Sequence, residues 1–306
     1  MKKNFLLLII IISSISLAQP KNRIIIQGSQ GTSLINPVYS PDGNKIAYTK
    51  NNYKGIWIFD LQTKNIFQLT DEDAAGFGFK WSSDSKSILT RVAKYENQKR
   101  FNAVKIFDLE TKSSQQLTDY KTMMPYLPNW FDGDSKILLP NKNDFEVFNF
   151  SFGKKGSSNN IIVFERNNKI IVKDVFKNNE ISLSPINDAQ YLNISISPDY
   201  SKIVFEVLGG NMFVINSDGT NIIDLGKGNR PHWSNDSKKI IYMITEDNGR
   251  EITSSDIFVI NSDGSSKNNL TNTEELFEMN PSFSPDSKSV VYDLINDGSI
   301  YLKNIE

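Results

Sequence analysis

Residues capable of acid–base or nucleophilic chemistry are few in this chain. Its 306 residues include one histidine, His232, and no cysteine. A Ser-His-Asp relay would have to use His232, and no Gly-x-Ser-x-Gly turn is present to hold the serine. The phosphate-binding pattern Gly-x-x-x-x-Gly-Lys-Ser/Thr is also missing. Four carboxylates in candidate loops, Glu72, Asp73, Glu246 and Glu278, have no common spacing. The residue types therefore favour binding over catalysis.

A set of polar residues could instead form a binding site. One position before a recurring aromatic residue stand Lys80, Asn129 and His232, and two positions earlier stand Asn36, Arg230 and Asn280. Alternate residues of a strand point to opposite sides, so these side chains face away from the aromatic series. We predict that they line a central channel and its mouth, where cations and amides would favour an anionic partner such as a peptide carboxylate. Simple hydration of the channel is the alternative.

No cofactor is expected from the sequence. Three aspartate–glycine turns, Asp132-Gly133-Asp134, Asp218-Gly219 and Asp263-Gly264, supply oxygen atoms that calcium could use. None of them follows the spacing of the twelve-residue calcium loop. Aspartate and glycine also form turns without any ion, because the carboxylate accepts backbone hydrogen bonds and glycine takes positive φ. Turn formation accounts for the three sites, and calcium is the alternative.

The elements that position these residues are predicted from an internal repeat. A short phrase, typically an aromatic residue followed by Ser-Pro-Asp-Gly, recurs six times, each time ahead of a short apolar run. Repeats at intervals of tens of residues are typical of propellers, solenoids and arrays. The copies begin at Tyr39, Trp81, Trp130, Ile196, Trp233 and Phe283.

Each repeat continues with further strand-like segments. A second set of β-formers ends in Asp or Asn, and most copies then have a polar turn and a fourth segment. Four antiparallel strands in about 40–50 residues are typical of one propeller blade. We therefore predict an all-β fold, a six-bladed β-propeller of four-stranded antiparallel blades. The third-strand segments end at Asp60, Asp108, Asp174, Asn216, Asn261 and Asn304.

One interval in this series is longer than the others. It lies between Asp108 and Asp174, and the excess falls at about 140–160. We interpret it as an inserted hairpin and loop, with a strand-like segment from Phe145 to Phe152. A seventh, degenerate blade is the alternative, because Phe150-Ser151 resembles the end of another inner strand.

The two ends of the chain are expected to close the ring. The sequence stops at Glu306, one strand short of a complete last blade. The segment from Arg23 to Gln27 is rich in β-formers and stands before the first inner strand. We predict that it pairs as the outer strand of the last blade, which removes an exposed sheet edge.

The first eighteen residues have the features of a secretory signal peptide. Lys2 and Lys3 precede the apolar run from Phe5 to Ile12, and Ser16-Leu17-Ala18 is a small-residue cleavage site. Residues 19–306 would then form a single domain in the periplasm or outside the cell, with no membrane span. Of the 34 basic and 35 acidic residues, removal of the two leader lysines leaves 32 basic against 35 acidic residues, a net charge of only −3. This balance argues against nucleic acid as a partner.

The pattern Asn-Pro-x-aromatic-Ser-Pro-Asp-Gly-x-x-Ile-Ala-Tyr, present at Asn36–Tyr48 and nearly complete at Asn280–Tyr292, resembles the repeat of TolB-like β-propellers. Related repeats occur in the propellers of prolyl oligopeptidase-like enzymes. The resemblance covers nearly all of residues 23–306. Periplasmic TolB carries an α/β domain ahead of its propeller, and no such domain, nor a following hydrolase domain, is expected here.

The resemblance and the residue pattern together imply a function class. We expect an exported, non-catalytic propeller that is a monomer and binds a protein or peptide of the cell envelope. A propeller enzyme, of the lactonase or lyase type, is one alternative. Carbohydrate binding through Tyr53 or Tyr95 is another.

Overall fold

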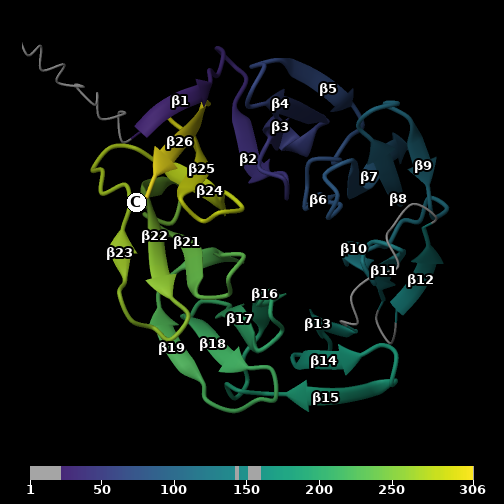
Figure 1. The fold of residues 1–306 in the computed structure, drawn as a ribbon, viewed down its shortest axis with the longest axis vertical. Coiled ribbons are helices and arrows are strands. Elements are labelled where there is room, and N and C mark those ends of the chain that lie inside the picture. Colours follow the sequence, from purple (N-terminus) through teal and green to yellow (C-terminus); the bar gives the residue numbers. More distant parts are fainter. Residues whose placement is uncertain (1–21, 142–144, 151–159, 306) are drawn as a thin grey trace, which may run out of the picture.

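Seven antiparallel β-sheets surround a common axis in the computed structural model, which describes residues 22–141, 145–150 and 160–305 (Figure 1). Within each sheet, strands consecutive in sequence lie side by side, so the chain runs outward through one blade before it starts the next. The fold is an all-β, seven-bladed propeller. The predicted signal peptide, residues 1–18, lies outside the described residues.

Blades 1 to 3 form the first part of the ring. Blade 1 contains β2 (Leu34–Tyr39), β3 (Lys45–Lys50), β4 (Ile56–Asp60) and β5 (Ile66–Thr70), with the 3-10 turn η1 (Asn51–Tyr53) between β3 and β4. Blade 2 contains β6 (Lys80–Trp81), β7 (Ser87–Glu96), β8 (Lys99–Asp108) and β9 (Ser114–Gln116). Blade 3 contains β10 (Asn129–Phe131), β11 (Lys136–Pro140) and β12 (Phe145–Asn149).

Blades 4 to 7 complete the ring. Blade 4 contains β13 (Ile161–Glu165), β14 (Ile170–Asp174) and β15 (Asn179–Leu183). Blade 5 contains β16 (Tyr191–Ile196), β17 (Lys202–Val207), β18 (Met212–Asn216) and β19 (Ile223–Gly226). Blade 6 contains β20 (Asn229–Trp233), β21 (Lys239–Asp247), β22 (Ile252–Asn261) and β23 (Asn268–Asn269). Blade 7 contains β24 (Glu278–Phe283), β25 (Ser289–Leu294), β26 (Ile300–Asn304) and β1 (Asn22–Ile26).

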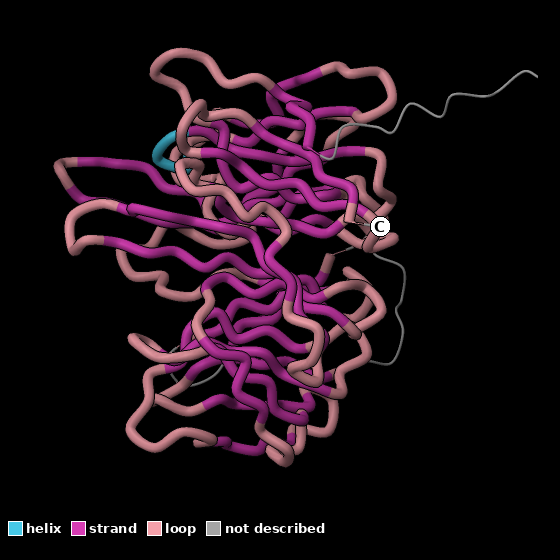
Figure 2. The backbone as a smooth tube through the Cα atoms, turned by 90° about the vertical axis from the view of Figure 1, so that its left-hand side faces the viewer, coloured by secondary structure: helices cyan, strands magenta, loops and turns pink. Residues whose placement is uncertain are grey.

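The side view shows which face carries the longer loops. In Figure 2, η1 (cyan) lies on the face from which strand hairpins project furthest. Within the described residues, no helix is long and apolar enough to cross a membrane.

The repeated phrase closes the inner hairpin of a blade through a serine and an aspartate. In blade 6 the Ser234 hydroxyl donates to Asp236 Oδ1 (2.6 Å) and accepts the Lys239 N–H (2.9 Å). Asp236 Oδ1 also accepts the Lys238 N–H (3.1 Å). This hydrogen-bonded turn explains why serine and aspartate recur at these two positions. The same pairs are Ser40 with Asp42, Ser82 with Asp84, Ser197 with Asp199, and Ser284 with Asp286.

One backbone hydrogen bond recurs in every blade and identifies the position of each strand. The residue after the third strand donates its N–H to the carbonyl of the residue just before the second strand. By this criterion β12 is the third strand of blade 3, whereas β13, β14 and β15 are the second, third and fourth strands of blade 4. The seven bonds are Leu61 to Asn44, Leu109 to Lys86, Phe150 to Ser135, Val175 to Asn160, Ser217 to Ser201, Ser262 to Lys238 and Ile305 to Lys288.

The prediction of six blades is therefore wrong, and the seven-blade alternative is confirmed. The segment interpreted as an inserted hairpin contains β12, which pairs with β11 along its whole length as an ordinary third strand. Phe150 follows β12 and is not the end of an inner strand. Phe150 follows the third strand of blade 3, and Asn160 precedes the second strand of blade 4. Val175 and Ser201 hold the same two positions one blade later. Blade 4 thus has no phrase to count, because its described residues contain no inner strand.

The predicted closure of the ring is confirmed. Strand β1 pairs antiparallel with β26, with Asn22 opposite Lys303 and Ile24 opposite Tyr301. A register shift between Ile24 and Ile26 places a bulge at Ile25. Blade 7 is therefore built from both ends of the chain.

Hydrophobic clusters fill six of the seven junctions between blades. The cluster between blades 7 and 1, for example, contains Ile26, Tyr39, Ile46 and Ile300. Equivalent clusters join blades 1–2, 2–3, 4–5, 5–6 and 6–7. Between blades 3 and 4 the described residues form no such cluster. That junction has aromatic and cation–π contacts instead, with Phe131 and Phe176 ring centroids 5.6 Å apart and Lys136 Nζ 4.7 Å from the Phe176 ring centroid.

Candidate functional site

The aromatic residues of the phrase position the channel residues that precede them. Trp130 Nε1 donates to the carbonyl oxygen of Lys80 in the preceding blade (3.1 Å). Trp81 Nε1 donates in the same way to Val38 (3.2 Å), and Trp233 Nε1 to Ser195 (3.1 Å). Each indole thus lies between two blades and ties the inner strands of both together. Because neighbouring residues of a strand point to opposite sides, the residue before each indole faces away from this junction.

Lys80 and Asn129 form a pair that links blades 2 and 3. Lys80 Nζ donates to Asn129 Oδ1, and Asn129 Nδ2 donates to the Leu127 carbonyl (3.3 Å). Lys80 is half-buried. Burial lowers the pKa of the Lys80 ammonium to about 8, because desolvation disfavours the charged form. No carboxylate of the described chain lies within salt-bridge distance of this ammonium.

The residues predicted at the channel mouth share an unusual backbone conformation. Asn36 (φ 57°), Arg230 (φ 52°) and Asn280 (φ 50°) all have positive φ. The paired strands shift register at these points, so each residue forms a bulge in its inner strand. Asparagine tolerates this conformation better than most residues, whereas it is strained for arginine. The asparagines therefore have a backbone role as well as a polar side chain.

A buried carboxyl group joins these mouth residues across three blades. Asp293, on β25, is only 1% exposed, and its Oδ1 accepts the Asn36 N–H (2.9 Å) and the Asn280 side-chain amide (2.9 Å). Arg230 Nη1 donates in turn to Asn280 Oδ1. Burial raises the pKa of the Asp293 carboxyl to about 7, although both hydrogen bonds and the Arg230 charge act in the opposite direction.

Glu206 repeats this arrangement between blades 5 and 6, two blade boundaries before that of Asp293. Its Oε1 accepts the Asn193 side-chain amide (2.8 Å) and the backbone N–H of Arg230. A continuous polar network therefore runs through blades 5, 6, 7 and 1. Sequence analysis missed Glu206 and Asp293. The signal that could have found them is an acidic residue at the end of an otherwise apolar second strand, as in Ile203-Val204-Phe205-Glu206 and Val290-Val291-Tyr292-Asp293.

His232 shares an electrostatic environment with the two cations. Its imidazole is exposed to solvent, beside Tyr39 and Ser282 in a cavity of about 210 Å³. Desolvation within the ring of blades, followed by the charges of Arg230 and Lys80, lowers the pKa of His232 to about 4. At neutral pH His232 is therefore a neutral hydrogen-bonding group.

The structure thus divides the six predicted residues into groups. Lys80 and Asn129 are in contact, and Asn36, Arg230 and Asn280 belong to the network around Asp293. His232 hydrogen-bonds to neither group, but the charges of both cations lower its pKa.

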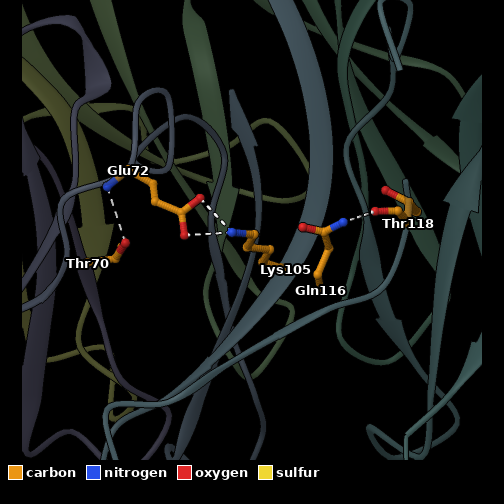
Figure 3. A network of polar contacts seen from close by, with 5 residues as sticks. All are labelled: Thr70, Glu72, Lys105, Gln116 and Thr118. Carbon is orange, nitrogen blue, oxygen red and sulfur yellow. Dashed lines mark hydrogen bonds and ion pairs between the residues drawn. The ribbon is translucent and has the colours of Figure 1, made fainter. Parts of the chain in front are cut away.

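Three of the four candidate loop carboxylates are engaged in other contacts. Glu72 binds Lys105 through both carboxylate oxygens (2.9 Å each), which links blades 1 and 2 (Figure 3). Asp73 lies 3.5 Å from Lys54, and the buried Glu278 accepts the Thr273 hydroxyl (3.0 Å). Glu246 lies on β21 in blade 6. In the described part of the chain, no three histidine, cysteine, aspartate or glutamate side chains lie together as a metal site would require.

The aspartates considered for calcium accept hydrogen bonds within their own turns. Asp218 Oδ1 accepts the N–H and hydroxyl of Thr220, and Asp263 Oδ1 accepts those of Ser265. Asp132 forms an ion pair with Lys136 (3.0 Å).

A second polar cavity lies at the rim between blades 1 and 2. It measures about 650 Å³ and is lined by Tyr53, Phe77, Arg91, Tyr95 and Arg100, among others. Tyr53 and Phe77 pack edge to face, with centroids 5.1 Å apart, and Tyr95 is 60% exposed. The structure therefore brings Tyr53 and Tyr95, which are distant in sequence, to one place.

The fold is similar to solved structures of TolB. TolB from Acinetobacter baumannii matches with a TM-score of 0.54 at 17% identity, over 82% of this chain and 57% of that chain. The putative TolB from Agrobacterium tumefaciens matches with a TM-score of 0.54 at 15% identity, over 89% of this chain and 90% of that one. The chain therefore shares the β-propeller fold of these TolB structures.

Other comparisons add little to this assignment. Oligogalacturonate lyase from Vibrio parahaemolyticus matches with a TM-score of 0.47 at 14% identity, over 89% of this chain and 77% of that one. No protein-family model and no curated protein matches the sequence.

Proposed function

We propose that this TolB-like propeller is an exported, non-catalytic scaffold that binds an acidic segment or terminal carboxylate of a cell-envelope protein in its central channel. One observation carries the proposal. Lys80 and Arg230 lie on β6 and β20, the inner strands of different blades, and neither forms an ion pair with a carboxylate of the described residues. A channel with this field would attract and orient an anionic group.

The proposal is tested by crosslinking and affinity capture from the native envelope. The tagged mature protein is compared with a Lys80→Ala/Arg230→Ala/His232→Ala variant, and melting temperatures establish that both are folded. A control variant removes three exposed lysines outside the channel, Lys99, Lys112 and Lys238. We expect a partner that the wild type and the control capture and the channel variant loses. A partner retained by all three would contradict channel binding.

A second candidate function is the binding of an acidic saccharide at the rim cavity. Aromatic faces suit sugar rings, and guanidinium groups suit carboxylates. Arg91 Nη1 donates to the Met124 carbonyl, whereas its buried Nε has no hydrogen-bond partner in the described structure. Titration calorimetry with uronic-acid and neutral oligosaccharides tests this. We expect only the acidic sugars to bind, and Tyr95→Ala to reduce their affinity about tenfold; no heat with either would reject this function.

A further inference from the structure

The hairpin between β21 and β22 in blade 6 carries the one Asn-Gly sequence of the chain, Asn248-Gly249. The two strands pair as far as Asp247 and Ile252, so residues 248–251 form the connection between them. Asn248 and Gly249 are both exposed to solvent. In an Asn-Gly sequence the glycine nitrogen can attack the side-chain amide of the asparagine, because glycine has no side chain to obstruct the ring that forms. The groups that surround these two residues therefore decide how readily they react.

The attacking atom, the backbone nitrogen of Gly249, has a proton acceptor in place. Its N–H donates to Asp247 Oδ1 (2.8 Å). An amide nitrogen becomes a good nucleophile only as its proton leaves. A carboxylate at hydrogen-bond distance from that proton has the position of a general base. Asp247 can therefore activate the nitrogen of Gly249.

The group under attack, the side-chain amide of Asn248, is polarised by the same hairpin. Asn248 Oδ1 accepts the backbone N–H groups of Arg250 (3.0 Å) and Glu251 (3.1 Å). Negative charge develops on this oxygen as the nitrogen attacks the side-chain carbon, and fixed N–H donors at this distance stabilise it. Apart from its chain neighbours, no atom of the described chain lies within 4 Å of the Cβ position of Gly249. The hairpin tip therefore has space for the ring and for water.

Other sequences in the chain that could form the same ring lack the base. Four Asp-Gly and two Asn-Ser pairs have their attacking N–H bound to a backbone carbonyl, which cannot remove the proton. Asn248-Gly249 differs from all six because its N–H is bound to a carboxylate. The six bonds run from Gly43 to Ser40, Gly219 to Asn216, Gly264 to Asn261, Gly298 to Leu294, Ser217 to Ser201 and Ser262 to Lys238.

We propose that Asn248 is a site of spontaneous deamidation that its own hairpin promotes. The Gly249 nitrogen bonds to Asn248 Cγ while its proton passes to Asp247. The Cγ–Nδ2 bond then breaks, Asp247 returns the proton to the departing nitrogen, and ammonia leaves. Water opens the resulting succinimide at either carbonyl, which gives aspartate or isoaspartate and releases a proton. A carboxylate thus replaces the amide, and the hairpin gains one negative charge.

The first test removes the base and keeps the hydrogen bond. Peptide mapping by mass spectrometry follows conversion at Asn248 while the mature protein is incubated at neutral pH. Asp247→Asn still offers an oxygen to the Gly249 N–H but cannot take its proton, so we expect conversion to slow about tenfold or more. Glu251→Gln is the control, because it removes one negative charge from the same hairpin and leaves Asp247 in place. Equal rates in the wild type and Asp247→Asn would overturn the proposal.

The second test removes the fold and keeps the sequence. In guanidinium chloride the unfolded chain has the same Asn-Gly pair without the hydrogen bonds of the hairpin. We expect the folded protein to convert about tenfold faster at the same pH, because the base and the two N–H donors are held in place only by the fold. Conversion that is equal or slower in the folded protein would show that the hairpin does not promote the reaction.

The product is identified by its charge and its chemistry. On isoelectric focusing, the aged wild type should acquire a more acidic band that migrates with fresh Asn248→Asp protein. Labelling of the aged protein by an isoaspartate methyltransferase should map to the same peptide. Asn248→Gln is the control, since a longer side chain does not readily close the ring. An acidic band that forms equally in Asn248→Gln would place the modification at another residue.

Discussion

At the scale of single residues, two titratable groups of the channel have pKa values shifted in opposite directions. The pKa of buried Asp293 is raised to about 7, and that of His232 is lowered to about 4. Between pH 4 and 7 the folded state keeps a proton on Asp293 that the unfolded chain has released, so this group makes stability fall as pH rises. Between pH 4 and 6.5 the unfolded chain instead binds a proton on His232 that the folded state excludes, so this group makes stability rise.

Replacing each group should reveal the contribution of the other. Asp293→Asn keeps an acceptor for Asn36 and Asn280 but cannot ionise. The stability of this variant should therefore rise from pH 4 to 6.5, because the contribution of His232 remains. His232→Gln should show the reverse, a fall from pH 4 to 7 on the order of 3 kcal/mol, because one pKa unit corresponds to about 1.4 kcal/mol. Urea denaturation at several pH values measures both. Parallel pH profiles for the two variants would contradict these pKa shifts.

The sequence predicted the local features of this site better than its contacts. The phrase revealed the inner strands and turns of six blades, because Ser234 and Asp236 hydrogen-bond within a few residues. Blade 4 was missed because it has no phrase. The sequence drew attention to Asn36 and Asn280, but their positive φ and their bonds to Asp293 depend on other strands and other blades. The same is true of Lys80 and Asn129, which lie in different blades and meet only because neighbouring blades pack side by side in the ring.

At the scale of elements, the N-terminal strand is a structural part of the last blade. Ile26 is 5% exposed and packs with Tyr39, Ile46 and Ile300, whereas Ile24 on the same strand is 44% exposed. Strand β1 therefore contributes to the core between blades 7 and 1 through one face only, as expected for an outer strand of alternating exposure.

Two matched substitutions test this contribution. Ile26→Ala should reduce the free energy of unfolding by about 2–5 kcal/mol, the usual cost of emptying a core position. Ile24→Ala should change it by less than about 1 kcal/mol, because that side chain is already in water. Urea denaturation measures both. Similar losses at the two positions would show that β1 does not pack as described.

At the scale of the whole molecule, the ring has one junction unlike the rest. Six junctions contain a hydrophobic cluster, but blades 3 and 4 meet through Phe131, Phe176 and lysine–aromatic contacts. Among the described residues, blade 4 contributes only β13, β14 and β15 to this junction. Burial of apolar area is the main stabilising term in such contacts, so this junction should be the least stable.

Hydrogen exchange can locate this weakness. Strands β11 and β14 are paired on both sides, as are β3 and β17. We expect amides of β11 and β14 to exchange about tenfold faster, because opening of the blade 3–4 junction exposes them at lower cost. Uniform protection of all four strands would contradict a weak junction.

The pairing of β1 with β26 also has a consequence for biosynthesis. Residues 22–26 leave the ribosome before any other described strand, yet their partner, residues 300–304, follows every other described strand. During that interval Ile26 has no blade to join and stays accessible to chaperones and proteases. Blade 7 and its junction with blade 1 therefore form only after residues 300–304 have been synthesised, so a product truncated before them would lack the closed ring.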